Sequence, residues 1–189
     1  MIKSLIFLLG IAIAPNYVIP GWKVIDLMWE RPLHPQLVFI KARHFSGIQE
    51  DKIEGERFII SFGTGSHVKF INLDEKTVLP ETESSLGIIF GSKTKDELLS
   101  GLKKLGVNVE RVTLDRLGGS VCFVLGDPSA KRLWVDKDSL VPLLVESRKW
   151  SLYFQNYKDF SGLLFPVRIE LKAQADAHTV IIEEVNSSQ

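Results

Sequence analysis

The chain has 189 residues, of which 45% are hydrophobic and 24% are charged, values typical of one globular domain and not of a disordered chain. The 23 basic and 23 acidic residues leave no net charge, so composition gives no electrostatic reason to bind DNA or RNA. The single cysteine, Cys122, excludes an internal disulfide and a cysteine-based zinc cluster.

The first residues have the pattern of an export signal. Lys3 precedes an uncharged apolar run over residues 4–14, which is too short to span a bilayer of roughly 30 Å. The run ends in Ala-Ile-Ala, a small-residue pattern typical of signal-peptide cleavage, although Pro15 hinders cleavage at that place. We therefore predict a signal peptide over residues 1–14 and a single domain over residues 15–189. The alternative is a buried hydrophobic helix.

Helical periodicity appears first in residues 21–30, where Val24, Leu27 and Met28 share one face and Pro32 ends the pattern. Three short apolar runs follow, separated by glycine and charged residues, and each is typical of a β-strand. They cover residues 37–45, 56–62 and 67–72.

A second helix is predicted over residues 94–105. Thr94 and Glu97 have the spacing of a capping box, and Gly106 is suited to close the C-terminal end. Acidic residues occupy the first turn and lysines the last, as the helix dipole favours. One face carries a leucine stripe made of Leu98, Leu102 and Leu105.

The remaining chain reads as strands, over residues 107–117, 120–125, 131–136, 141–154, 163–172 and 178–185. Gly118-Gly119 fits a tight hairpin between the first two of these strands. The run 163–172 alternates most clearly, although Pro166 suggests an edge or a bulge there. One of its faces carries Leu163, Phe165, Val167, Ile169 and Leu171.

Strands this close in sequence lack room for parallel crossovers, so we predict a meandering antiparallel sheet with two helices. Several strands present one strongly apolar face that must be covered. The helices cover part of it, and the rest is either a tight core or a cavity for an apolar ligand. Outside the run 163–172, the apolar faces are made by Phe58, Ile60, Phe62, Val68, Phe70, Trp150, Leu152 and Phe154.

Residues 121–171 resemble the LolA-like superfamily of periplasmic lipoprotein carriers. The resemblance rests on two segments in this order and spacing, covering a quarter to a third of the chain. The first has the form LWVD-x-x-(S/T)-x-x-P, and the second the form Y-x-x-(F/V)-x-G-(L/I)-x-(F/L)-P-x-x-I. In this sequence they are Leu133, Trp134, Val135, Asp136, Ser139 and Pro142, then Tyr157, Phe160, Gly162, Leu163, Phe165, Pro166 and Ile169.

The resemblance implies a curved, incomplete antiparallel β-barrel whose concave apolar face is covered by helices acting as a lid. The implied function is to hold lipoprotein acyl chains, or another hydrophobic ligand, while crossing an aqueous compartment. It also implies a periplasmic monomer, possessing an inner-membrane donor and an outer-membrane acceptor, in outer-membrane biogenesis. We expect the lid to include Leu98, Leu102 and Leu105, and the ligand to contact Phe58, Ile60, Phe62, Phe70, Trp150, Leu152, Phe154, Phe165, Val167 and Ile169.

One departure limits what the resemblance implies. Lipoprotein carriers have an Arg-Pro pair on an early strand, whereas this chain reads FGTGSHVKF over residues 62–70. The fold and the class of hydrophobic ligand therefore carry over, and lipoprotein transfer does not follow.

No constellation of residues indicates catalysis, a metal or a cofactor. None of the four histidines has a histidine two or four residues away, so metal-ligand spacing is absent. Asp136 and Asp138 resemble a carboxylate pair, but a turn at this point uses them for its own backbone. We expect a binding protein and no enzyme. The alternative is an interaction or structural module of the cell envelope with a filled core and no cargo.

Overall fold

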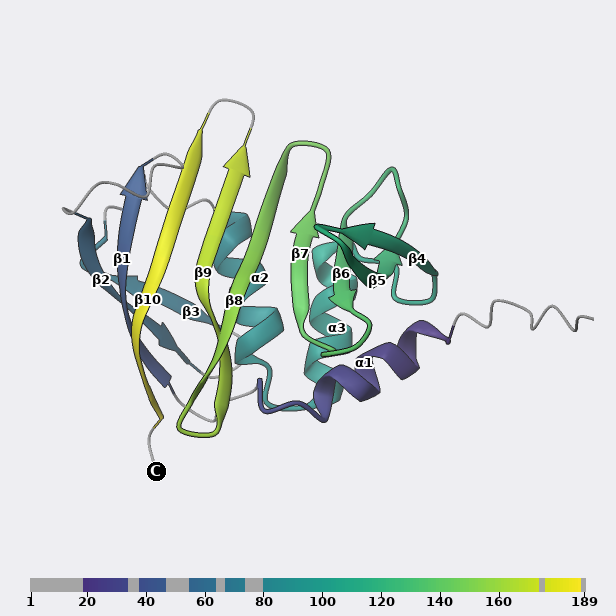
Figure 1. Cartoon of the computed structure of the whole chain (residues 1–189), viewed down its shortest axis with the longest axis horizontal. Coiled ribbons are helices and arrows are strands. Elements are labelled where there is room, and N and C mark those ends of the chain that lie inside the picture. Colours follow the sequence, from purple (N-terminus) through teal and green to yellow (C-terminus); the bar gives the residue numbers. More distant parts are fainter. Residues whose placement is uncertain are drawn as a thin grey trace, which may run out of the picture.

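The computed structural model describes residues 19–33, 38–46, 55–63, 67–73, 80–173 and 176–187, so the predicted signal peptide lies outside the described residues. These residues form three helices and one ten-stranded antiparallel sheet (Figure 1). The helices are α1 (Gly21–Trp29), α2 (Pro80–Gly91) and α3 (Lys95–Leu105). The strands are β1 (Val38–Ser46), β2 (Glu56–Phe62), β3 (Val68–Ile71), β4 (Val112–Leu117), β5 (Ser120–Gly126), β6 (Arg132–Asp136), β7 (Pro142–Glu146), β8 (Trp150–Phe160), β9 (Leu163–Ala173) and β10 (Ala177–Ser187).

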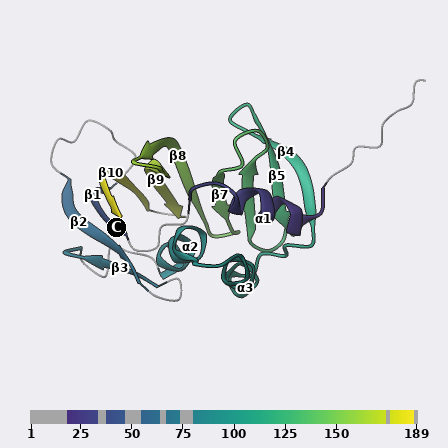
Figure 2. The ribbon, with the colours of Figure 1, turned by 90° about the horizontal axis from the view of Figure 1, so that it is seen from below.

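The strand order places the helices. The order is β3-β2-β1-β10-β9-β8-β7-β6-β5-β4, so the first and last strands pair within the sheet while β3 and β4 lie at its two edges. The connection from β3 to β4 therefore has to cross from one edge of the sheet to the other. It contains α2 and α3, which lie beneath the arch of the curved sheet in Figure 2.

The end signals of α3 act as predicted. The Thr94 hydroxyl accepts a hydrogen bond from the backbone N–H of Glu97 at 3.1 Å. The Glu97 carboxylate accepts the backbone N–H of Lys93 at 2.8 Å, one residue before the position that a capping box uses. Gly106 closes the helix in the left-handed conformation, with φ 95°. The leucine stripe of Leu98, Leu102 and Leu105 is buried.

The predicted hairpin is also present. Leu117 pairs with Ser120, which leaves Gly118 and Gly119 as a two-residue turn between β4 and β5. Both glycines have positive φ, 57° and 94°, as the favoured two-residue hairpin turn requires. Strand β4 begins at Val112 and not at residue 107, because residues 108–111 form a turn closed by a hydrogen bond from the Arg111 N–H to the Asn108 carbonyl.

Helix α2 is absent from the sequence prediction. Pro80 suits a first helical position, and acidic residues in the first turn suit the helix dipole. Its apolar residues, however, are crowded into its second half around Gly87, so they show no clear helical period. The prediction of two helices was therefore wrong, because α2 is a third helix beside the two that were predicted.

Two further expectations need correction. The predicted strand 141–154 is two strands, β7 and β8, because the chain reverses at Ser147, whose hydroxyl accepts the N–H groups of Lys149 and Trp150, both at 3.2 Å. This turn has no glycine or proline to reveal it. On α1, Ile25 is buried in place of Leu27, so the buried face consists of Val24, Ile25 and Met28.

Candidate functional site

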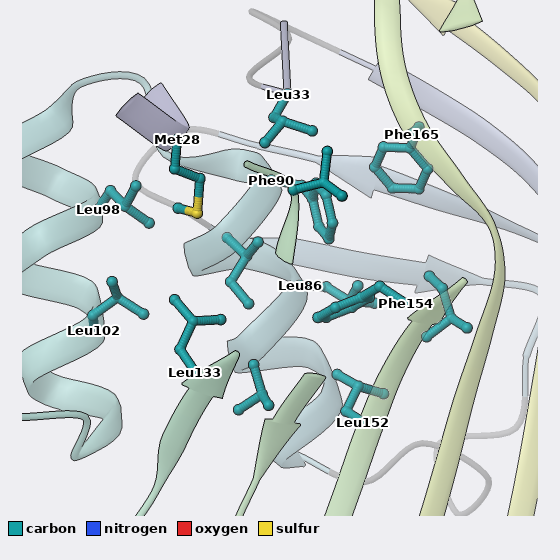
Figure 3. Close-up of a cluster of buried hydrophobic side chains, with 14 of the residues drawn as sticks. Met28, Leu33, Leu86, Phe90, Leu98, Leu102, Leu133, Leu152, Phe154 and Phe165 are labelled. Atoms are coloured by element: carbon teal, nitrogen blue, oxygen red, sulfur yellow. The ribbon is translucent and has the colours of Figure 1, made fainter. Parts of the chain in front are cut away.

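The concave face of the sheet brings together most of the side chains predicted to contact a ligand. Phe70 lies partly buried at the edge of the cluster that they form, and the three leucines of α3 join the same cluster. Figure 3 shows Leu98 and Leu102 of α3 opposite Leu133, Leu152 and Phe154 of the sheet. The predicted residues buried in this cluster are Phe58, Ile60, Phe62, Trp150, Leu152, Phe154, Phe165 and Ile169.

Strand β9 departs from the predicted alternation at one position. Leu163, Phe165, Ile169 and Leu171 are buried, whereas Val167 is only partly buried and is not part of the cluster. The facing strand β8 contains Asn156 with φ 56°, between the pairs Gln155↔Arg168 and Tyr157↔Pro166. This left-handed residue interrupts the regular pleat opposite Val167.

Pro166 lies in an interior strand, where a proline is unusual. The pairing of β9 with β10 extends only to Arg168, so β9 has no described partner on that side at Pro166. Two residues earlier in β9, the segment after α1 contacts the strand, where the Pro32 carbonyl accepts the N–H of Leu164 at 2.8 Å. Pro166 therefore sits at a local edge, and its missing N–H removes no bond to β10.

The centre of the concave face is filled by α2. Phe90 is fully buried, and its ring centroid lies 5.2 Å from that of Phe154 and 4.7 Å from that of Phe165 (Figure 3). Phe165 in turn meets the ring of Phe62 edge-on at 6.3 Å. Sequence reasoning found the three sheet phenylalanines but not Phe90, because α2 itself was missed. In this structure the apolar interior is occupied by the protein's own side chain.

Helix α2 carries polar groups among its buried side chains. Thr82, Ser85 and Ser92 are all buried in the α2 segment. The Ser92 hydroxyl donates to the Ile88 carbonyl at 2.6 Å, but the Thr82 hydroxyl oxygen has no hydrogen-bond partner among the described residues. An unpartnered buried hydroxyl costs about 1–3 kcal/mol, so α2 is held less tightly than an apolar helix of its length would be.

Helix α1 fixes one end of the helical layer. The Asp26 carboxylate accepts from the Lys95 ammonium at 2.8 Å, which ties α1 to the first turn of α3. Met28 and, after the helix, Leu33 are fully buried in the concave cluster (Figure 3). Helix α3 is thus attached both through its leucines and through α1.

The helices also border an open groove. Its volume is about 700 Å³, and it lies between the start of β3 and the helices α2 and α3. Most of its lining is polar, including His67, Glu83, Asp96, Glu97 and Lys104. Val68 and Ile88 add apolar surface to the same lining, so the groove is mixed in character, whereas the concave interior is lined by apolar side chains.

The concave face holds one polar pair from the sheet. His44 of β1 is buried, and its Nε2 lies 3.0 Å from Nδ1 of His178 in β10. The two rings are stacked, with centroids 5.2 Å apart. Burial, and after it the neighbouring His178, lowers the pKa of His44 below its ordinary value. The two histidines are 134 residues apart, and no local pattern in the sequence pairs them.

The convex face has a small buried cluster of its own, made of Cys122, Val124, Trp134 and Leu144. Cys122 is fully buried, and burial raises the pKa of its thiol. The Trp134 indole N–H donates to the Glu146 carboxylate at 2.7 Å, so this tryptophan faces away from the concave interior. Trp150 is the tryptophan that contributes to the concave cluster.

Asp136 serves its own turn, as predicted. Its Oδ1 accepts the backbone N–H groups of Asp138 and Ser139 and the Ser139 hydroxyl. Although burial acts in the opposite direction, these hydrogen bonds hold the pKa of Asp136 below its ordinary value.

Within the described residues, no group of three His, Cys, Asp or Glu side chains is arranged to hold a metal ion. No helix in the described part of the chain is long and apolar enough to cross a membrane.

Solved structures provide a comparison for this arrangement. The chain is similar to a LolA superfamily protein from Nitrosomonas europaea, with a TM-score of 0.53 and 12% identity over 91% of this chain and 95% of that one. It is also similar to a DUF1329 family protein from Desulfovibrio piger, with a TM-score of 0.47 and 11% identity over 89% of this chain and 92% of that one. No protein-family model and no curated protein matches the chain. The first likeness confirms the predicted fold, an incomplete antiparallel barrel with helices over its concave face.

Proposed function

From this LolA-like fold we propose that the protein is a carrier or binding protein for lipoprotein acyl chains or another hydrophobic ligand. The ligand is held on the concave face of the sheet, between the sheet and the helices. One observation carries the proposal: the apolar face is closed by a separate helix, α2, through Phe90. Displacing that ring frees a surface of phenylalanines without breaking a strand pair.

The energetics allow such an exchange. An acyl chain gains about 0.8 kcal/mol for each CH₂ that it buries, so ten methylenes supply about 8 kcal/mol. Moving α2 away exposes Leu86, Ile89 and Phe90 at about 1.5–3 kcal/mol each, so the acyl chain has to bury ten or more methylenes to offset the cost. The unpartnered Thr82 hydroxyl lowers the cost of moving α2 further, since water satisfies it once the helix lifts. Release of the ligand follows when α2 returns or a partner competes.

The proposal includes a place of action. The apolar run over residues 4–14 directs export, and the folded domain works in the periplasm as a monomer between an inner-membrane donor and an outer-membrane acceptor. The proposed role is binding and transport, without catalysis.

The central experiment removes the Phe90 ring. We predict that Phe90→Ala increases the binding of an environment-sensitive apolar dye severalfold, because the ring no longer occupies the surface between Phe154 and Phe165. Dye fluorescence is titrated against protein. The matched control is Leu144→Ala, which also truncates a buried side chain, but on the convex face. Equal dye binding by both variants would mean that the concave face offers no special site.

The filled interior also favours a second candidate, a cell-envelope interaction or structural module with no cargo. Native mass spectrometry of protein purified from the periplasm separates the two functions. Bound lipid supports the carrier, whereas a ligand-free protein that takes up no acyl chain on incubation supports the module.

Export is tested on its own. We predict that fractionation of cells expressing the full chain recovers the protein outside the cytoplasm, with residues near the N-terminus removed. Replacing three leucines of the run 4–14 by lysine should retain the protein in the cytosol, because a charged segment is a poor export signal. Full-length wild-type protein in the cytosol would contradict the prediction.

A further inference from the structure

The paired histidines lie on the same face as the apolar cluster. In β1, Ile40 and Ala42 are buried in that cluster, and His44 follows at the next position of the same parity. His44 is directly opposite Val180 in β10, and His178 is directly opposite Leu171 in β9. Side chains that face each other across an antiparallel pair share a face of the sheet. The imidazoles therefore lie where the apolar surface ends, beside Ser46 of β1 and Glu56 of β2.

The charged surroundings of the pair are limited. The cross-strand partner of His44 on β2 is Glu56, which shares this face and is exposed. Arg43 lies on the opposite face, where it pairs with Glu183. The neighbours from β9 and β10, Leu171 and Val180, are apolar. Helix α2 contributes the buried apolar side chains Leu86, Ile89 and Phe90 to the same interior.

The hydrogen bond within the pair leaves capacity for a ligand. It uses Nε2 of His44 and Nδ1 of His178, so Nδ1 of His44 and Nε2 of His178 have no partner among the described residues. His178 is only half-buried, so its free nitrogen is within reach of the solvent. A neutral imidazole has a single N–H donor, so the neutral pair offers one N–H to a ligand. With one added proton the pair offers two, and a bound anion stabilises that protonated form.

We propose that the His44–His178 pair is the headgroup site for an amphiphile with an anionic headgroup, a carboxylate or a phosphate monoester. The acyl chain lies along the concave face toward Phe154 and Phe165, and the headgroup accepts hydrogen bonds from the pair. The inference rests on the proposed function and names the class of ligand that the concave site selects. Glu56 opposes the anion, but it is exposed, so water and salt screen its effect.

The test compares three ligands of equal chain length. Dodecanoate, dodecyl phosphate and dodecanol are titrated into the full-length protein by calorimetry at pH 6, below their critical micelle concentrations. We expect one or both anions to bind about tenfold more tightly than the alcohol, the ratio that a charge-assisted hydrogen bond supplies. Tighter binding of dodecanoate would identify the headgroup as a carboxylate, and tighter binding of dodecyl phosphate would identify it as a phosphate monoester. Raising the pH to 8 should weaken the binding of both anions and leave the affinity for dodecanol unchanged.

Variants locate the preference. His44→Leu and His178→Leu should abolish it while changing dodecanol affinity by less than about twofold, because both leave the apolar face intact. If His44→Leu does not fold, His44→Gln takes its place. A further variant, Glu56→Gln, should tighten the binding of the anions, because it removes a negative charge beside the pair. The matched control is His67→Leu, which changes an exposed histidine bordering the outer groove.

The outcomes separate the two proposals. Equal affinities of the three ligands for the wild type, or an anion preference that survives both leucine variants, would overturn the headgroup site and leave the carrier standing. Absence of binding by all three ligands would overturn the carrier and the headgroup site with it.

Discussion

At the scale of single residues, the buried pair of His44 and His178 makes the stability of the fold depend on pH. His44 is buried beside its partner His178, whereas in the unfolded chain it is exposed to water. Because burial and the second imidazole lower the pKa of His44, the unfolded chain takes up a proton at a higher pH than the folded protein does. The pair therefore links folding to pH.

We predict that the wild type loses stability as the pH falls from about 7 to 5, through the ordinary titration range of histidine. The variant His44→Leu should lose less over the same range, since it lacks the group whose pKa is lowered. Chemical denaturation at each pH measures the free energy of unfolding. The two profiles should diverge by about 1.4 kcal/mol for each unit of pKa shift. Parallel profiles would show that His44 titrates alike in both states.

At the scale of elements, the covering layer depends on how closely α2 and α3 approach. Gly101 in α3 faces Ile88 of α2, and a Cβ added at Gly101 would lie 2.9 Å from the Ile88 Cγ2 methyl. From sequence alone this glycine only weakens its helix, by about 1 kcal/mol relative to alanine. The structure gives it a packing role, since it makes room for a stiff β-branched side chain.

We predict that Gly101→Ala destabilises the protein by about 1 kcal/mol, because overpacking of about 1–3 kcal/mol exceeds the gain in helix propensity. Thermal or chemical unfolding measures the change. In a background that carries Ile88→Ala, the same substitution should become neutral or stabilising, since the clashing methyl is gone. A stabilising effect in the wild-type background would mean that the helices do not meet at this point.

For the whole molecule, the question is whether the interior is only a core or also a binding site. Phe165 is fully buried against Phe62 and Phe90. Without ligand, Phe165→Ala should therefore cost about 3–5 kcal/mol, as deletion of a packed phenylalanine ring does. A bound acyl chain should raise the melting temperature of the wild type, because it binds only the folded state.

The ligand should also narrow the gap between the wild type and Phe165→Ala, because an acyl chain partly fills the space left by the ring. Melting temperatures of both proteins, with and without dodecanoate, provide the comparison. A large cost of the substitution combined with no ligand-induced shift in either protein would favour the filled module over the carrier.

The sequence by itself determined the elements whose signals are local. Strand β2 begins and ends where the pattern 56–62 predicts, and α3 has the predicted caps at Thr94 and Gly106. The hairpin at Gly118 was equally readable, since its conformation depends on the two residues of the turn. The alternation of apolar side chains also identified most of the concave face, because side chains two apart in a strand necessarily share a face.

Only the tertiary structure decided what meets across long separations. Helix α2 has little helical periodicity of its own, and it becomes the centre of the interior because the chain must cross from β3 to β4 beneath a curved sheet. The contact of Phe90 with Phe154 and Phe165 follows from that crossing. His44 and His178 are 134 residues apart and meet because the first and last strands pair. Neither contact leaves a trace in local sequence, since each is set by strand order and not by spacing along the chain.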